Sequence, residues 1–240
     1  MVKITDADAA GRNVMKHIAR VVVTLLLLLS MSGAARAEGT AIFVGAKTWI
    51  NNWKSETPGS ESVESTTVAL IGWEFEADFS NHVFANASYL MSVEDYKFDP
   101  AVISAHIERT DFDIAFGYQF NRYAGAFAGY RSTQFKDNLT ERRETASGPL
   151  FGVRGTAPLT DALSLVGKLT GLPMIDKATF TVPEQRERAR GWFAEVGVTY
   201  AFTSRITGAL GYKYETATGK NTRIRDTFGG MTFGVVYKYQ

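Results

Sequence analysis

The chain has 240 residues, of which 45% are hydrophobic and 21% are charged, and none is cysteine. The lack of cysteine excludes disulfide scaffolds, thiolate metal sites and cysteine nucleophiles. The 26 basic and 25 acidic residues leave almost no positive surplus, so we expect no nucleic-acid partner and a single ordered domain.

Residues 1–37 have the pattern of a secretory signal peptide. An apolar run at residues 21–31 follows basic residues, and residues 35–37 read Ala-Arg-Ala, the small-x-small pattern that signal peptidase accepts. The apolar run is shorter than the roughly 20 residues that a membrane-spanning helix needs. We therefore expect an exported protein whose mature chain, residues 38–240, is one domain.

After this leader, apolar and polar residues alternate with the period of two that is typical of β-strands. The alternation is cleanest around Phe116, where a row of apolar residues faces away from Asp111 and Asp113. Two of the ten alternating segments, 124–131 and 151–156, are less apolar, which leaves eight strands open as an alternative to ten. In chain order the segments are 42–53, 69–77, 83–92, 111–120, 124–131, 151–156, 163–170, 192–202, 206–215 and 230–239.

The connections between these segments alternate in length along the chain. Adjacent strands joined in this way form an antiparallel meander with tight turns at one end and long loops at the other. We therefore predict an all-β fold, a transmembrane up-and-down antiparallel β-barrel of ten strands. The expected short connections are 79–82, 121–123, 158–162 and 203–205, and the expected long ones are 54–65, 94–109, 136–148, 172–190 and 216–226.

One face of the predicted strands is apolar, and the other face collects charged residues. A soluble ligand-carrying barrel, the alternative, would bury these charges in an apolar core, where each unpaired charge costs several kcal/mol. A membrane barrel instead turns its apolar face to lipid and keeps a polar interior. The predicted interior network consists of Lys47, Glu74, Glu76, Asp111, Asp113, Arg131, Arg154, Lys168, Glu195, Lys213, Glu215 and Lys238.

The leader, the alternating strands and the aromatic end of the chain resemble the bacterial outer-membrane β-barrel superfamily over residues 38–240. The last strand carries aromatic residues up to Tyr239, although Gln240 follows where the superfamily ends on an aromatic residue. The resemblance implies a Gram-negative outer membrane, a monomer inserted by the outer-membrane assembly machinery, and contact with outer-membrane lipid and lipopolysaccharide. It carries over no catalytic residue, because function varies freely among these barrels.

The predicted interior charges are balanced, with six of each sign. A barrel of about eight to ten strands is barely wider than the side chains inside it, so charges on opposite walls should meet. We expect a paired, water-laced plug that occludes the interior. A narrow pore for small solutes is the alternative, although a selective pore should show a bias of sign.

A rim-located hydrolase acting on lipid or peptide is a second alternative. After the leader the chain has two histidines, His82 in a predicted short turn and His106 in a predicted long loop. His106 with Asp111 and Asp113 has the residue types of an acid–base site, but nothing in the spacing requires the three to meet. We therefore expect no catalytic residue, no cofactor and no metal ion.

Arginines concentrate in three of the predicted long loops. A guanidinium binds phosphate through two parallel hydrogen bonds, so these loops suit the phosphates of lipopolysaccharide. Solvated charged loops without a partner are the alternative. We expect a structural or surface-interaction role, with candidate lipopolysaccharide contacts at Arg142, Arg143, Arg186, Arg188, Arg190, Arg223 and Arg225.

Overall fold

A computed structural model describes residues 40–79, 81–99, 105–178 and 186–239, and the predicted signal peptide lies outside them. In this part of the chain no helix is long and apolar enough to cross a membrane. The described residues form ten long strands and two strands of two residues each. The long strands are β1 (Ala41–Glu56), β3 (Val68–Asp78), β4 (Val83–Ser92), β6 (His106–Asn121), β7 (Ala124–Asp137), β8 (Arg142–Pro158), β9 (Leu163–Ala178), β10 (Arg186–Ala201), β11 (Ile206–Gly219) and β12 (Arg225–Tyr239).

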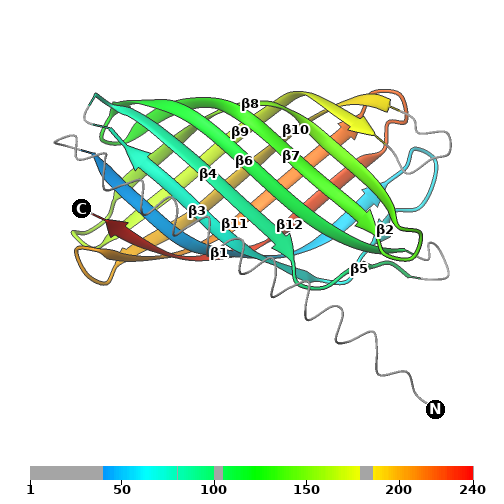
Figure 1. Ribbon diagram of the computed structural model, residues 1–240, viewed down its shortest axis with the longest axis horizontal. Helices are drawn as coiled ribbons and strands as arrows, with labels where there is room; N and C mark the ends of the chain where they lie inside the picture. Colours follow the sequence, from blue (N-terminus) through cyan, green and yellow to red (C-terminus); the bar gives the residue numbers. More distant parts are fainter. Residues whose placement is uncertain (1–39, 80, 100–104, 179–185, 240) are drawn as a thin grey trace, which may run out of the picture. The chain divides into compact units, whose positions relative to one another are not determined.

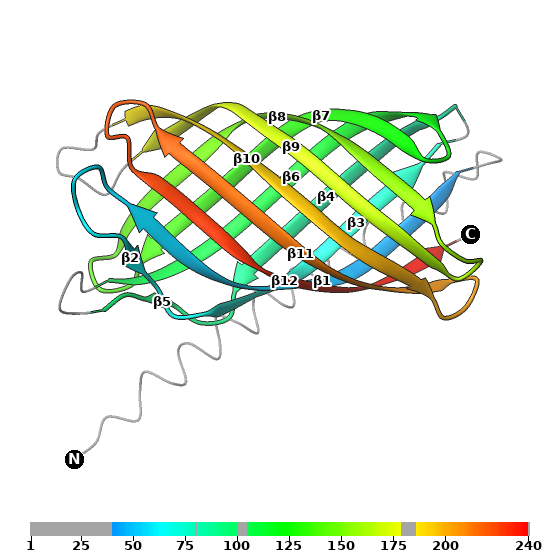
Figure 2. The ribbon, with the colours of Figure 1, turned by 180° about the vertical axis from the view of Figure 1, so that it is seen from behind.

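The ten long strands close into one antiparallel barrel (Figures 1 and 2). Each long strand pairs with the next one in the chain, and β12 pairs back with β1, from Ile42 opposite Tyr239 to Glu56 opposite Arg225. A closed sheet has no unpaired edge, which is the condition for a sheet to cross lipid. The prediction of a ten-stranded up-and-down barrel is confirmed, and the eight-stranded alternative is wrong.

The two ends of the barrel differ in their connections. The start of β1 and the end of β12 lie at the end with the tight turns, here called the short-turn end (Figure 1). The opposite end, here called the long-loop end, also carries the two short strands, β2 (Val63–Glu64) and β5 (Tyr96–Lys97), which pair with β1 and β6. Three of the tight turns are 122–123, 159–162 and 202–205.

The apolar face of the strands points outward, as the alternation predicts. Phe116 is 60% exposed and Val196 is 55% exposed, whereas Trp49 and Phe84 on the interior face are almost fully buried. An outward belt of large apolar side chains matches lipid and not water. The face assignment is therefore that of a membrane barrel, and the soluble alternative is excluded.

The strands extend further toward the long-loop end than the sequence pattern predicts. β6 begins at His106, inside the predicted loop 94–109, and β8, β9 and β10 occupy much of the predicted loops 136–148 and 172–190. Beyond the apolar belt the outward positions carry polar residues, so the alternation of hydropathy fades while the backbone ladder continues. The predicted loop boundaries at this end are therefore wrong, and the barrel wall is taller than expected.

Candidate functional site: a charged barrel interior

A group of charged side chains inside the barrel forms the central ion-pair cluster, which consists of Arg109, Asp111, Asp113, Arg131, Lys213 and Glu215. Arg109 Nη2 lies 2.8 Å from Asp111 Oδ2 and 3.0 Å from Glu215 Oε1. Arg131 Nη2 lies 2.9 Å from Glu215 Oε2 and 3.2 Å from Asp111 Oδ2. Three basic and three acidic groups thus share one network without net charge.

Strand register brings these groups together. Arg109, Asp111 and Asp113 share one face of β6 because residues two apart in a strand point the same way. Arg131 on β7 lies directly opposite Asp113 in the ladder. Glu215 reaches the same network from β11, 84 positions after Arg131 in the chain. The cluster therefore ties separate parts of the wall together across the interior.

Aromatic rings enclose the guanidinium of Arg109, which is 0% exposed. Its Cζ lies 4.0 Å from the ring centroid of Phe228 and 5.0 Å from that of Trp49. Lys213 Nζ lies 4.1 Å from the Trp49 centroid. Cation–π contacts and ion pairs together offset the cost of burying these charges. Around the central ion-pair cluster the interior is thus filled by aromatic rings as well as by charged groups. The expectation of a water-laced plug does not include these rings.

An aromatic layer fills the interior between the central ion-pair cluster and the long-loop end. The ring centroids of Trp53 and Phe135 are 5.1 Å apart, and Trp53 Nε1 donates a hydrogen bond to Asp226 Oδ1 at 3.0 Å. Lys177 Nζ lies 3.0 Å from a carboxylate oxygen of Asp226 and 3.0 Å from one of Glu144. The long-loop half of the barrel is therefore closely filled.

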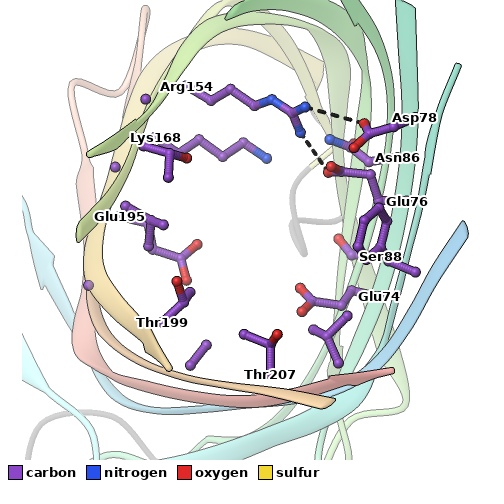
Figure 3. Close-up of a pocket in the computed structure, with 18 of the residues that line it drawn as sticks. Glu74, Glu76, Asp78, Asn86, Ser88, Arg154, Lys168, Glu195, Thr199 and Thr207 are labelled. Carbon is purple, nitrogen blue, oxygen red and sulfur yellow. Dashed lines mark hydrogen bonds and ion pairs between the residues drawn. The ribbon is translucent and has the colours of Figure 1, made fainter. Parts of the chain in front are cut away.

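The short-turn half of the barrel is open (Figure 3). A cavity of 730 Å³, here called the vestibule, is lined by Lys47 and Phe127 and by residues of the short turns, His82 and Arg122. Small and neutral polar residues make up much of its remaining interior lining. The two halves of the interior thus differ in kind, one packed and the other solvent-accessible.

Ion pairs also line the vestibule. Lys47 Nζ lies 2.7 Å from Glu195 Oε1, although the two residues are 148 positions apart. Arg154 Nη1 lies 2.7 Å from Glu76 Oε2, and Arg154 Nη2 lies 3.5 Å from Asp78 Oδ1 (Figure 3). These pairs are partly exposed, so water weakens them relative to the pairs of the central cluster.

The residues predicted for the interior network all lie on the interior faces of their strands. Glu74 and Lys168 point into the vestibule, and Lys238 Nζ lies 5.9 Å from the ring centroid of Phe43; none of these three forms an ion pair with a described residue. The structure joins the others in ion pairs: Lys47, Glu76, Asp111, Asp113, Arg131, Arg154, Glu195, Lys213 and Glu215.

Sequence reasoning misses several charged residues of the interior, including the buried Glu187 of β10. Arg109, Glu144, Lys177 and Asp226 all fall in predicted loops, whereas the structure places them on strands. Arg109 carries a signal that could have found it, because it precedes Asp111 by two positions and therefore shares its face. The other three follow no hydropathy pattern, so only the extended backbone ladder reveals them.

The candidate acid–base residues do not meet. His106 starts β6, with its Nδ1 3.8 Å from Asp95 Oδ2, whereas Asp111 and Asp113 bind arginines of the central cluster. His82 lies in a short turn at the other end of the barrel. Among the described residues, no group of three or more His, Asp or Glu side chains could hold a metal ion.

The candidate lipopolysaccharide contacts lie mostly on strand ends and not in loops as predicted. On β10, the exposed Arg188 and Arg190 alternate with the buried Glu187 and Ala189, so both arginines face outward. Because the strands are longer than predicted, these side chains project from the barrel wall and not from loops. Arg142 and Arg143 lie on β8, Arg186, Arg188 and Arg190 on β10, Arg225 on β12, and Arg223 in the turn between β11 and β12.

A family model described as "Outer membrane protein beta-barrel domain" matches residues 21–240. No curated protein matches the chain. The structure of the outer membrane protease OmpT from Escherichia coli is similar with a TM-score of 0.59 at 11% identity, over 85% of this chain and 98% of that one. Neisserial surface protein A matches with a TM-score of 0.37 at 16% identity, over 84% and 100% of the two chains. At these identities the likeness to OmpT shows a shared fold alone.

Proposed function

Because the chain belongs to the outer-membrane β-barrel family, we propose that it is a non-enzymatic, occluded barrel with a structural or surface-interaction role in a Gram-negative outer membrane. The packed long-loop half of the interior is the observation that carries this proposal. There Arg109 is 0% exposed among ion pairs and aromatic rings, and a passing solute would have to displace them. No cofactor and no catalytic group is part of the proposal.

The orientation of the barrel follows from the family. In bacterial outer-membrane barrels the short turns face the periplasm and the longer loops face the outside. The packed half then faces outward and the vestibule faces the periplasm. The central ion-pair cluster has no net charge, which argues against the selective narrow pore.

The occluded interior predicts that the wild-type protein shows no steady conductance in a planar lipid bilayer. Replacing Arg109 and Arg131 together by alanine leaves Asp111, Asp113 and Glu215 without their arginines. The uncompensated carboxylates should draw in water and cations and give a small, cation-selective current. A large, stable, unselective current through the wild-type protein would instead support the pore.

The surface role rests on arginines directly beyond the lipid-facing belt. On the outward face of β10, Arg188 and Arg190 are followed by Trp192, which is 44% exposed. A pocket of 490 Å³ beside Arg188 is lined by basic and hydroxyl residues and by two acidic ones: Arg186, Arg188, Lys177, Thr145, Ser147, Asp176 and Glu187. Guanidinium and hydroxyl groups at the level where lipid headgroups begin suit the phosphates of lipopolysaccharide, which we take as the partner.

The double variant Arg188→Gln, Arg190→Gln tests this surface. The affinity of the purified variant for lipopolysaccharide is expected to fall by a factor of about ten or more, because hydrogen bonds between charged groups are lost. Binding is measured by surface plasmon resonance on lipopolysaccharide-containing vesicles. The matched control Arg122→Gln, Arg205→Gln removes the same charge at the short-turn end and should bind as the wild type does. Equal losses in both variants would remove the case for a specific surface.

A further inference from the structure

Charged groups of the vestibule face one another from opposite walls. β3 presents Glu74, Glu76 and Asp78, whose spacing of two places all three carboxylates on the interior face. Arg154 of β8 and Lys168 of β9 extend from the opposite wall (Figure 3). β3 thus supplies three carboxylates to one wall, and β8 and β9 supply two cations to the opposite wall. The Lys47–Glu195 pair adds one charge of each sign to the same lining.

Arg154 reaches from β8 to the carboxylates of β3. It forms ion pairs with Glu76 and Asp78, its Nε and Nη2 donate hydrogen bonds to Gln119 Oε1, and its Cζ lies 3.4 Å from the ring centroid of Phe84. This arginine therefore has its partners within the protein. It occupies one side of the vestibule and leaves the centre open.

Glu74 and Lys168 take no part in the ion pairs of the vestibule that the described residues form. Both point into the open centre of the vestibule from opposite walls, and neither forms an ion pair with any residue that the structure describes (Figure 3). Lys168 Nζ lies 4.9 Å from the ring centroid of Phe127, which holds the ammonium over an aromatic surface. In the central ion-pair cluster, by contrast, every charged group has an opposite charge beside it.

The space between these two charges has the size and lining of a ligand site. Its volume of 730 Å³ falls within the range of about 300–1,000 Å³ that is typical of small-molecule pockets. Neutral hydrogen-bonding groups surround the two charges, and they come from several strands. They include Asn86 and Ser88 of β4, Thr199 of β10 and Thr207 of β11.

We infer that the vestibule binds a small zwitterionic solute, whose carboxylate or phosphate pairs with Lys168 and whose ammonium pairs with Glu74. A ligand with a single charge would leave one wall group without a partner, whereas a zwitterion satisfies both through charge-assisted hydrogen bonds. The vestibule opens at the short-turn end, so the solute enters from the periplasm. This site lies apart from the proposed outer-surface role and does not depend on it.

Isothermal titration of the full mature protein in detergent tests the site with defined probes. Glycine, γ-aminobutyrate and ε-aminocaproate vary the distance between ammonium and carboxylate, and O-phosphoethanolamine replaces the carboxylate by phosphate. At least one of these probes is expected to bind saturably. Butyrate and butylammonium, which carry one charge each, should bind about tenfold more weakly or not at all.

Three variants assign the binding to the vestibule. Lys168→Met and Glu74→Gln should each weaken binding of the best probe about tenfold, and Ala209→Phe should abolish it by filling the cavity. The matched controls Lys220→Met and Glu94→Gln alter exposed residues elsewhere and should leave binding unchanged. Heat-dependent gel mobility verifies that each barrel is folded. The inference is overturned if no zwitterion binds, if butyrate or butylammonium binds as tightly, or if the folded vestibule variants bind as the wild type does.

Discussion

Replacing Arg109 by alanine is expected to lower the free energy of unfolding by about 3–5 kcal/mol, because the change leaves a buried cluster with one more carboxylate than cations. Asp111 and Glu215 both lie within 3.0 Å of the Arg109 guanidinium, and both are nearly inaccessible to water. The lost contacts with Phe228 and Trp49 add to the effect. Urea-induced unfolding in detergent, followed by tryptophan fluorescence, measures the change.

Two controls separate a stranded charge from a simple loss of volume. The double variant Arg109→Ala, Glu215→Gln removes one negative charge as well, which restores the charge balance of the cluster and should recover part of the stability. Arg154→Ala deletes an arginine whose side chain is 23% exposed in the vestibule, so it should cost less than Arg109→Ala. Equal costs for the two arginines would show that the central cluster is no more protected from water than the vestibule.

Placing an arginine on the outer face of β6 is the second large expected effect. Phe116 is 60% exposed at the centre of the apolar row of its strand, so Phe116→Arg should cost about 2–4 kcal/mol in a lipid bilayer. The cost arises because the guanidinium replaces an apolar ring against hydrocarbon. Urea-induced unfolding in lipid vesicles measures this effect, since a detergent micelle accommodates the charge more easily.

Ser88→Arg is the matched substitution on the interior face. Ser88 lies opposite Glu74 and Asp113 in the ladder and lines the vestibule, so a new guanidinium there would meet carboxylates and water. Its expected cost is small, or it stabilises the barrel slightly by pairing with Glu74. If Ser88→Arg proved as costly as Phe116→Arg, the assignment of the strand faces would be wrong.

Strand number and face assignment are predictable from the sequence because lipid imposes a strict period on the outward positions. The less apolar segments 124–131 and 151–156 are strands as well, and each is hydrogen-bonded to a neighbouring strand on both sides. Between the apolar belt and the long-loop end, the outward positions no longer face lipid and need not be apolar. Thr145 and Asp176 face outward there without any apolar signature, so the ends of β8 and β9 are predicted as loops.

The interior is predictable in its composition but not in its pairing. Alternation indicates that Lys47 and Glu195 face inward, yet only the curvature of the closed sheet brings them within 2.7 Å. Trp49 and Phe193 also face inward, but no sequence pattern indicates that they pack against the charged groups of the central ion-pair cluster. The division into a packed half and an open half depends on three-dimensional packing, which no periodicity reports.

The pairing of β1 with β12 joins the first and last strands in one seam, so the barrel closes only when both strands are in place. The contact of Ile42 with Tyr239 joins residues from the two ends of the described barrel sequence. Such a contact forms slowly, because the entropy of the intervening chain must be lost before the contact can offset that loss. Until β12 arrives, β1 exposes unpaired N–H and C=O groups that can recruit other chains. A chain that ends before Arg225 therefore lacks the strand that closes the barrel, and its sheet keeps an unpaired edge at β1.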